Sequence, residues 1–171
     1  MRYFTRGWAN GELTDDEGDC VRKAYATRLE EIASKLPSSM ARLRQGVSLH
    51  DALIESVRWR PSAAELHVTL VAGTSEVGYE TIDLTYRGAM LGRRRIESLR
   101  NAACNREACV LYHEIDIADD DRTLAHRLLF WPNEEVTIEF LELEYASASR
   151  SDCRVALGGA FVVDPEGEDQ G

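Results

Sequence analysis

The sequence predicts an α+β fold in which helices come first and a mostly antiparallel sheet follows. Two patterns of apolar residues carry this prediction. Over residues 14–36 apolar residues recur every three or four positions, which is the period of a helix with one buried face. From Val47 onward they alternate with polar residues, which is the period of a half-buried strand. A group of helices followed by a run of strands is typical of α+β domains.

The first quarter of the chain is expected to hold an arm and two helices. Residues 1–13 mix aromatic residues with glycines and should form an extended arm whose aromatic side chains dock on the body. Thr14 and Glu17 have the spacing of a capping box, so a helix should begin at Thr14. Pro37 is expected to end this helix. A shorter helix should follow over about residues 38–45.

The rest of the chain should form a meander of about six or seven strands, and this sheet could also curl toward a barrel. A short helix over residues 93–105 interrupts the strands. The expected strands cover about residues 53–59, 66–70, 82–86, 108–117, 122–131 and 135–145, with a further strand within 154–163. Within 135–145 the apolar parity changes between Phe140 and Leu141, which a β-bulge would produce.

We expect a single domain. The chain has 171 residues, of which 44% are hydrophobic, and no internal repeat or linker divides it. The domain should consist of an arm and helices over residues 1–46, a sheet over 47–163 and an acidic tail over 164–171.

Loop lengths predict the register of the strands after residue 108. A four-residue loop over residues 118–121 would place His113 directly opposite His126. A three-residue loop over residues 132–134 would place Ile138 opposite Leu128.

Charge and composition exclude several classes of protein. The net charge is −10, from 30 acidic and 20 basic residues, so a nucleic-acid partner is not expected. No apolar stretch is long enough to span a membrane, and the first residues lack the apolar core of a signal peptide. We therefore expect a cytoplasmic protein with reduced cysteines, no membrane contact and no cofactor. An exposed edge strand could pair with its copy and form a homodimer.

Several short motifs resemble a family of bacterial proteins. The opening Met1-Arg2-Tyr3-Phe4-Thr5-Arg6 is similar to the start of a domain of unknown function whose members begin Met-Lys-Tyr-Phe-Thr-Lys. The similarity continues in residues 49–54, 116–130 and 136–145. The resemblance implies no activity. The pattern His50-Asp51 followed by a strand also resembles small toxin-immunity domains.

Five polar residues are candidates for a site. His113 and His126 should face each other on an apolar face, where they could hold a metal or an anion, act as a proton-sensitive switch, or simply hydrogen-bond each other. His50 and Asp51 form a dyad like that of metal-dependent phosphohydrolases, although a turn is the simpler interpretation. Arg127 should lie on the face opposite the histidines.

These observations leave two hypotheses of function. The first is a non-enzymatic binding or accessory domain, of which an immunity-like protein would be one form, that acts by contact with a partner protein. It rests on the acidic surface and on the absence of an evident catalytic set in the sequence. The alternative is a small-molecule or metal-dependent enzyme that uses His113 and His126.

Overall fold

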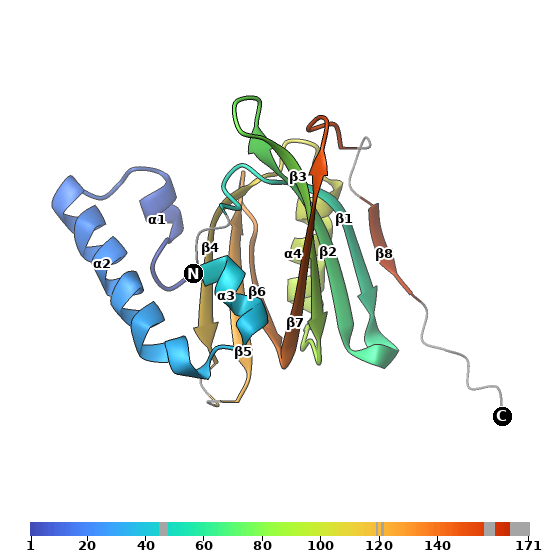
Figure 1. Ribbon diagram of the computed structural model, residues 1–171, viewed down its shortest axis with the longest axis horizontal. Coiled ribbons are helices and arrows are strands. Elements are labelled where there is room, and N and C mark those ends of the chain that lie inside the picture. The colour runs from blue at the N-terminus through green and yellow to red at the C-terminus, as the bar shows by residue number, and fades with distance from the viewer. Residues whose placement is uncertain (45–47, 119, 121, 156–159, 165–171) are drawn as a thin grey trace.

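The computed structural model shows an α+β protein with two β-sheets, and it describes residues 1–44, 48–118, 120, 122–155 and 160–164 (Figure 1). The larger sheet has the strand order β7-β3-β2-β1-β8, and the smaller has the order β4-β5-β6. The strands are β1 (Leu53–Arg60), β2 (Glu65–Thr74), β3 (Gly78–Arg87), β4 (Val110–Ile117), β5 (Leu124–Phe130), β6 (Glu135–Phe140), β7 (Glu142–Arg150) and β8 (Ala160–Val163). The predicted fold class is confirmed, but the single meander is wrong.

In the described ranges four α-helices accompany the sheets, and their ends follow local chemistry. They are α1 (Arg6–Ala9), α2 (Asp15–Ile32), α3 (Ser38–Arg44) and α4 (Arg93–Cys104). The predicted capping box is present, because the Thr14 hydroxyl accepts from the Glu17 N–H and the Glu17 carboxylate accepts from the Thr14 N–H. Helix α2 ends before Pro37 in a short 3₁₀ turn, and α1 makes the arm less extended than predicted.

The larger sheet is built from an antiparallel meander with one added strand on each side. Strands β1, β2 and β3 follow each other in space, β7 pairs antiparallel with β3, and β8 pairs parallel with β1. With β8 as its one parallel strand among the described residues, the larger sheet is mixed, within the mostly antiparallel arrangement that was expected. Alternate side chains are buried on one face, as a half-buried strand requires. These are Val57, Trp59, Leu66, Val68, Leu70, Ile82, Leu84, Tyr86 and Leu143.

The smaller sheet is an antiparallel meander whose register differs from the predicted one by two residues in both hairpins. His126 lies opposite Ile115 rather than His113, and Leu128 lies opposite Val136 rather than Ile138. The first difference arises because residues 118–123 connect β4 to β5, a longer connection than predicted. A shift of two leaves the side chains of residues 112–117 and 124–130 on their predicted faces, since the side chains of a strand alternate with a period of two. A further irregularity between Val110 and Tyr112 places Val110 opposite Phe130, on the face of the histidines, which the sequence did not predict.

The change of apolar parity after Phe140 marks a passage between the sheets, and the predicted continuous strand with a β-bulge is wrong. Strand β6 ends at Phe140 in the smaller sheet, and β7 begins at Glu142 in the larger one. At the corner, the Leu141 N–H donates to the Arg87 carbonyl at 2.9 Å. Isolated bridges also join the sheets, but the strands do not close into a barrel.

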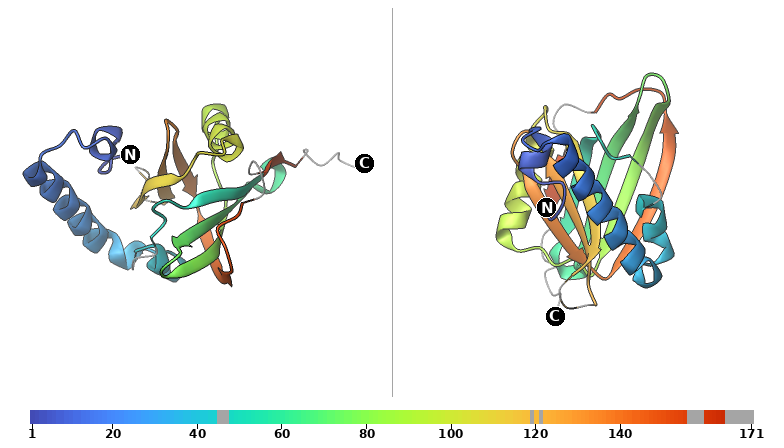
Figure 2. Two further views of the ribbon diagram at one scale, coloured as in Figure 1. Left: turned by 90° about the horizontal axis from the view of Figure 1, so that it is seen from above. Right: turned by 90° about the vertical axis from the view of Figure 1, so that its left-hand side faces the viewer.

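The core lies between the two sheets and α4. Figure 2 shows that the sheets diverge on one side, where α4 lies between them. Leu99, Ala102 and Ala103 of α4 are buried there. Tyr86 and Phe140 meet across the sheets with ring centroids 5.0 Å apart. Both rings are fully buried, and burial of such a side chain contributes about 2 kcal/mol.

Some predicted features lie outside the described residues. These are the start of the sheet at Val47, two positions of the loop over 118–121, and most of the acidic tail over 164–171.

Candidate functional site

The predicted histidine pair exists, although its geometry is diagonal. His113 on β4 lies opposite Leu128, two residues along β5 from His126. Nδ1 of His113 is 3.2 Å from Nε2 of His126, and the rings meet edge to face with centroids 5.3 Å apart. His126 is completely buried, whereas His113 is half-buried.

A third side chain from the other sheet extends this pair into a relay. The Tyr86 hydroxyl lies 2.7 Å from Nδ1 of His126, and this nitrogen is the hydrogen-bond partner of the hydroxyl among the described residues. Because a buried O–H needs an acceptor, Tyr86 donates to Nδ1 of His126. Nε2 of His126 then carries the proton and donates to Nδ1 of His113. We call Tyr86, His126 and His113 the relay.

Burial keeps two members of the relay, His126 and Tyr86, uncharged. Desolvation, with a smaller effect of the neighbouring His113, holds the pKa of His126 well below its ordinary value of 6.5. Burial likewise raises the pKa of Tyr86, so its phenol stays protonated. Within the part of the chain that the structure describes, no three His, Cys, Asp or Glu side chains are placed to hold a metal ion.

Arg127 belongs to a separate polar cluster on the opposite face of the smaller sheet, as its parity predicted. Glu114, Asp116 and Arg127 are all buried, and the Arg127 guanidinium is 3.2 Å from Asp116. Burial alone would raise the pKa of Asp116, but its bond from the Ile117 N–H and its contacts with Arg28 and Arg127 hold the pKa below the usual value. Arg127 therefore neutralises buried carboxylates and does not approach the histidines.

These carboxylates hold the N-terminal arm. The fully buried Glu114 carboxylate accepts from the backbone N–H groups of Arg2, Tyr3 and Phe4, at 2.8, 2.7 and 2.7 Å. Three converging donors satisfy a charge that would be costly to bury alone. The arm aromatics then pack on α2 and β4, as predicted, with Phe4 5.1 Å from Tyr25 and 5.5 Å from Tyr112 between ring centroids.

His50 and Asp51 occupy a turn, as the simpler interpretation of the sequence held. Asp51 adopts a left-handed backbone with φ 60°, and its N–H donates to the Val110 carbonyl at 2.8 Å. His50 Nδ1 is 2.6 Å from the Leu111 carbonyl and therefore donates to it. The backbone of β4 thus fixes the His50 ring.

The structure brings His50 and His113 to one pocket beside β4. This edge pocket has a volume of about 300 Å³. Its walls come from the arm, α2, the turn before β1 and β4. The lining residues are Phe4, Tyr25, Ser48, Leu49, His50, Leu111, Tyr112 and His113.

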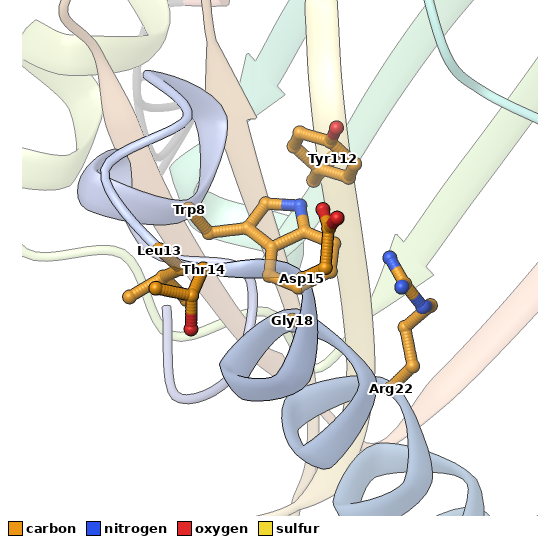
Figure 3. A pocket seen from close by; sticks show the side chains of 7 residues that line it. All are labelled: Trp8, Leu13, Thr14, Asp15, Gly18, Arg22 and Tyr112. Atoms are coloured by element: carbon orange, nitrogen blue, oxygen red, sulfur yellow. The ribbon is translucent and has the colours of Figure 1, made fainter.

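A smaller pocket of about 170 Å³ lies on the other side of Tyr112 (Figure 3). The Trp8 indole, Asp15 and Arg22 line it at the start of α2. Arg22 stacks over the Trp8 ring at 5.2 Å and also pairs with Asp19. The cation that lines this pocket therefore already has partners in the same chain.

Sequence reasoning missed Tyr86, Tyr112 and Tyr25 as parts of the site. Tyr25 lies in the helical apolar pattern of residues 14–36 and Tyr86 at the end of the strand expected over 82–86, but contacts between distant elements decide which of these residues meet a pocket. The aromatic opening of the chain was the available signal, because aromatic side chains need a surface on which to dock.

The fold and this pocket define the chain as an α+β domain with an aromatic cleft. It belongs to a family described as "Protein of unknown function (DUF4085)", whose model matches residues 4–140. The resemblance inferred from the opening motif is thereby confirmed. No curated protein and no solved structure matches the chain. No helix among the described residues is long and apolar enough to cross a membrane.

Proposed function

We propose that this protein is a non-enzymatic binding domain whose edge pocket receives an aromatic side chain of a partner protein. The lining of the pocket carries this proposal. Three aromatic rings and two leucines surround a space of about 300 Å³ that is large enough for a ring. Aromatic side chains inserted into such pockets are the usual energetic anchors of protein interfaces.

The polar groups of the pocket favour a ring that carries a hydrogen-bond donor. Since His50 donates from Nδ1 to Leu111, neutral His50 presents Nε2 as an acceptor. The Asp51 carboxylate, 3.7 Å from this nitrogen, adds negative potential. A tyrosine hydroxyl or a tryptophan N–H would satisfy this acceptor, whereas phenylalanine would not.

The net charge favours a basic partner. A charge of −10 steers a basic surface toward the domain and speeds the encounter. An immunity-type protein in the cytoplasm that covers a basic toxin would be one form of this function.

Short peptides test the proposal directly. Acetylated and amidated Arg-Tyr-Arg, Glu-Tyr-Glu and Arg-Leu-Arg differ only in charge or in the ring. We expect Arg-Tyr-Arg to bind most tightly, with shifts of the Leu111 and Tyr112 amide signals in NMR titrations. His50→Ala should weaken its binding about fivefold, which corresponds to one net hydrogen bond of about 1 kcal/mol.

His67→Ala is the matched control, because His67 is a partly exposed histidine on β2, outside the pocket. It should bind Arg-Tyr-Arg as the wild type does. Equal affinity for Arg-Leu-Arg, or an unchanged affinity in His50→Ala, would contradict the proposal.

The relay favours one alternative, an acid–base enzyme for a small molecule centred on His113. An enzyme of this kind would use the reverse tautomers of the relay, in which His126 donates from Nδ1 to the Tyr86 oxygen and His113 donates from Nδ1 to Nε2 of His126. Nε2 of His113 then carries the lone pair of a base or nucleophile. The ester p-nitrophenyl acetate, which imidazoles cleave, discriminates between the two functions. Cleavage that is lost in His113→Ala and kept in His50→Ala and His67→Ala would support the enzyme.

A further inference from the structure

We propose that two copies of this chain associate through β7, whose outer edge pairs antiparallel with the same edge of the second copy. Strand β7 forms the margin of the larger sheet (Figure 2). Among the described residues, its one strand partner is β3. The pairing would join two five-stranded sheets into one.

The other sheet margins are covered or short. At β4, His50 donates to the Leu111 carbonyl and the Ile115 N–H donates to the Tyr25 hydroxyl at 2.8 Å. At β6, Met90 donates to the Glu139 carbonyl at 2.8 Å. Strand β8 has only 4 residues. Side chains or neighbouring backbone therefore protect the smaller sheet on both sides.

No backbone group or side chain in the described part of the chain is bonded in this way to the outer edge of the second half of β7. Ala146, Ser147, Ala148 and Ser149 are exposed in succession, so both faces of the strand are open there. These residues include no proline and no charged side chain. Prolines and charged side chains, especially lysines, are the usual means of blocking the edge of a sheet. Their small side chains allow another backbone to approach closely.

The charge pattern of β7 favours a second copy in antiparallel orientation. The strand begins with Glu142 and Glu144 and ends with Arg150. Within one chain Arg150 pairs with Glu55 at 2.7 Å and Glu144 with Arg87 at 3.1 Å, so a second copy would share these charges. Antiparallel pairing centred on Ala146 sets Arg150 against Glu142 of the second copy, and pairing centred on Ser147 sets it against Glu144. Opposite charges across a strand pair are stabilising, and like charges are not.

Sedimentation of the full chain tests the proposal. One strand pair is a small interface, so the association should depend on concentration. We expect the 19.2 kDa chain to sediment with twice its mass as the concentration rises. Ser147→Lys and Ser147→Glu each place like charges together and should raise the dissociation constant about tenfold or more.

An equimolar mixture of Ser147→Lys and Ser147→Glu should restore the dimer, which excludes misfolding as the cause of the loss. Ser62→Lys, with the same change at an exposed turn, should dimerise like the wild type. A wild-type chain that stays monomeric at every concentration would overturn the proposal and leave this edge to a strand of another protein. Failure of the mixture to dimerise where the wild type does would also overturn it.

Discussion

At the scale of single residues, the relay shows how a buried polar group can be kept neutral. His126 has no exposed surface, and both of its ring nitrogens have partners, Tyr86 and His113. Such satisfaction is what permits an imidazole in an apolar core. Burial costs free energy only when the His126 ring takes up a second proton and becomes charged.

Protonation of His126 should make stability depend on pH. Its pKa is lowered in the folded protein, so below about pH 6.5 the unfolded chain binds a proton that the folded chain does not. The contribution of neutral His126 to the free energy of unfolding is therefore fully present above that pH. It is lost as the pH falls, by at most about 1.4 kcal/mol per pH unit. Urea unfolding between about pH 5 and 7 measures this slope.

His126→Gln removes the titrating group and should flatten the slope, whatever its effect on the stability at pH 7. Asp116 does not interfere, because its lowered pKa places its own loss of stability at more acidic pH. An equally steep slope in His126→Gln would show that another group is responsible.

At the scale of elements, the arm is held by carboxylates of the smaller sheet, chiefly Glu114, rather than by its own backbone pattern. Residues 1–5 make no strand, yet three of their N–H groups converge on Glu114. The polar cluster around Glu114 and Asp116 and the aromatic contacts together join the arm and α2 to the smaller sheet.

Glu114→Gln should therefore loosen the arm and destabilise the protein by about 2 kcal/mol. One carboxylate oxygen becomes an amide that faces backbone N–H groups, so at least one bond to a charged acceptor is lost. Urea denaturation gives the free energy of unfolding. Glu144→Gln, at an exposed position on β7, should change it by less than about 0.5 kcal/mol. Similar losses in the two variants would refute the role of Glu114.

The elements themselves were largely predictable, and their partners were not. The capping box, α3, α4 and the faces of β4 and β5 follow from local pattern, because propensity and parity are local properties. The connection after Ile117 is longer than predicted, so the predicted register was wrong by two residues. A shift of two keeps side chains on the same face, and His113 therefore still lies beside His126. The corner at Leu141 could not be distinguished from a β-bulge, since both shift the parity by one.

At the scale of the whole molecule, the two sheets share one core. The relay joins β3 to β5 and β4, the rings of Tyr86 and Phe140 meet across the sheets, and the chain passes directly from β6 into β7. The pocket also depends on this arrangement, because His50 precedes a strand of one sheet and His113 belongs to the other. Separation of the sheets would therefore dismantle the candidate site.

The shared core predicts that the protein unfolds as a single domain, in one cooperative transition. Differential scanning calorimetry should show one peak whose calorimetric and van't Hoff enthalpies agree. For a chain of 171 residues the enthalpy should be about 120 kcal/mol near about 60 °C, from about 0.7 kcal/mol per residue. Tyr86→Phe, which removes a hydrogen bond between the sheets, should lower the midpoint while keeping one peak. Two peaks, or a van't Hoff enthalpy well below the calorimetric one, would mean that the sheets unfold as separate units.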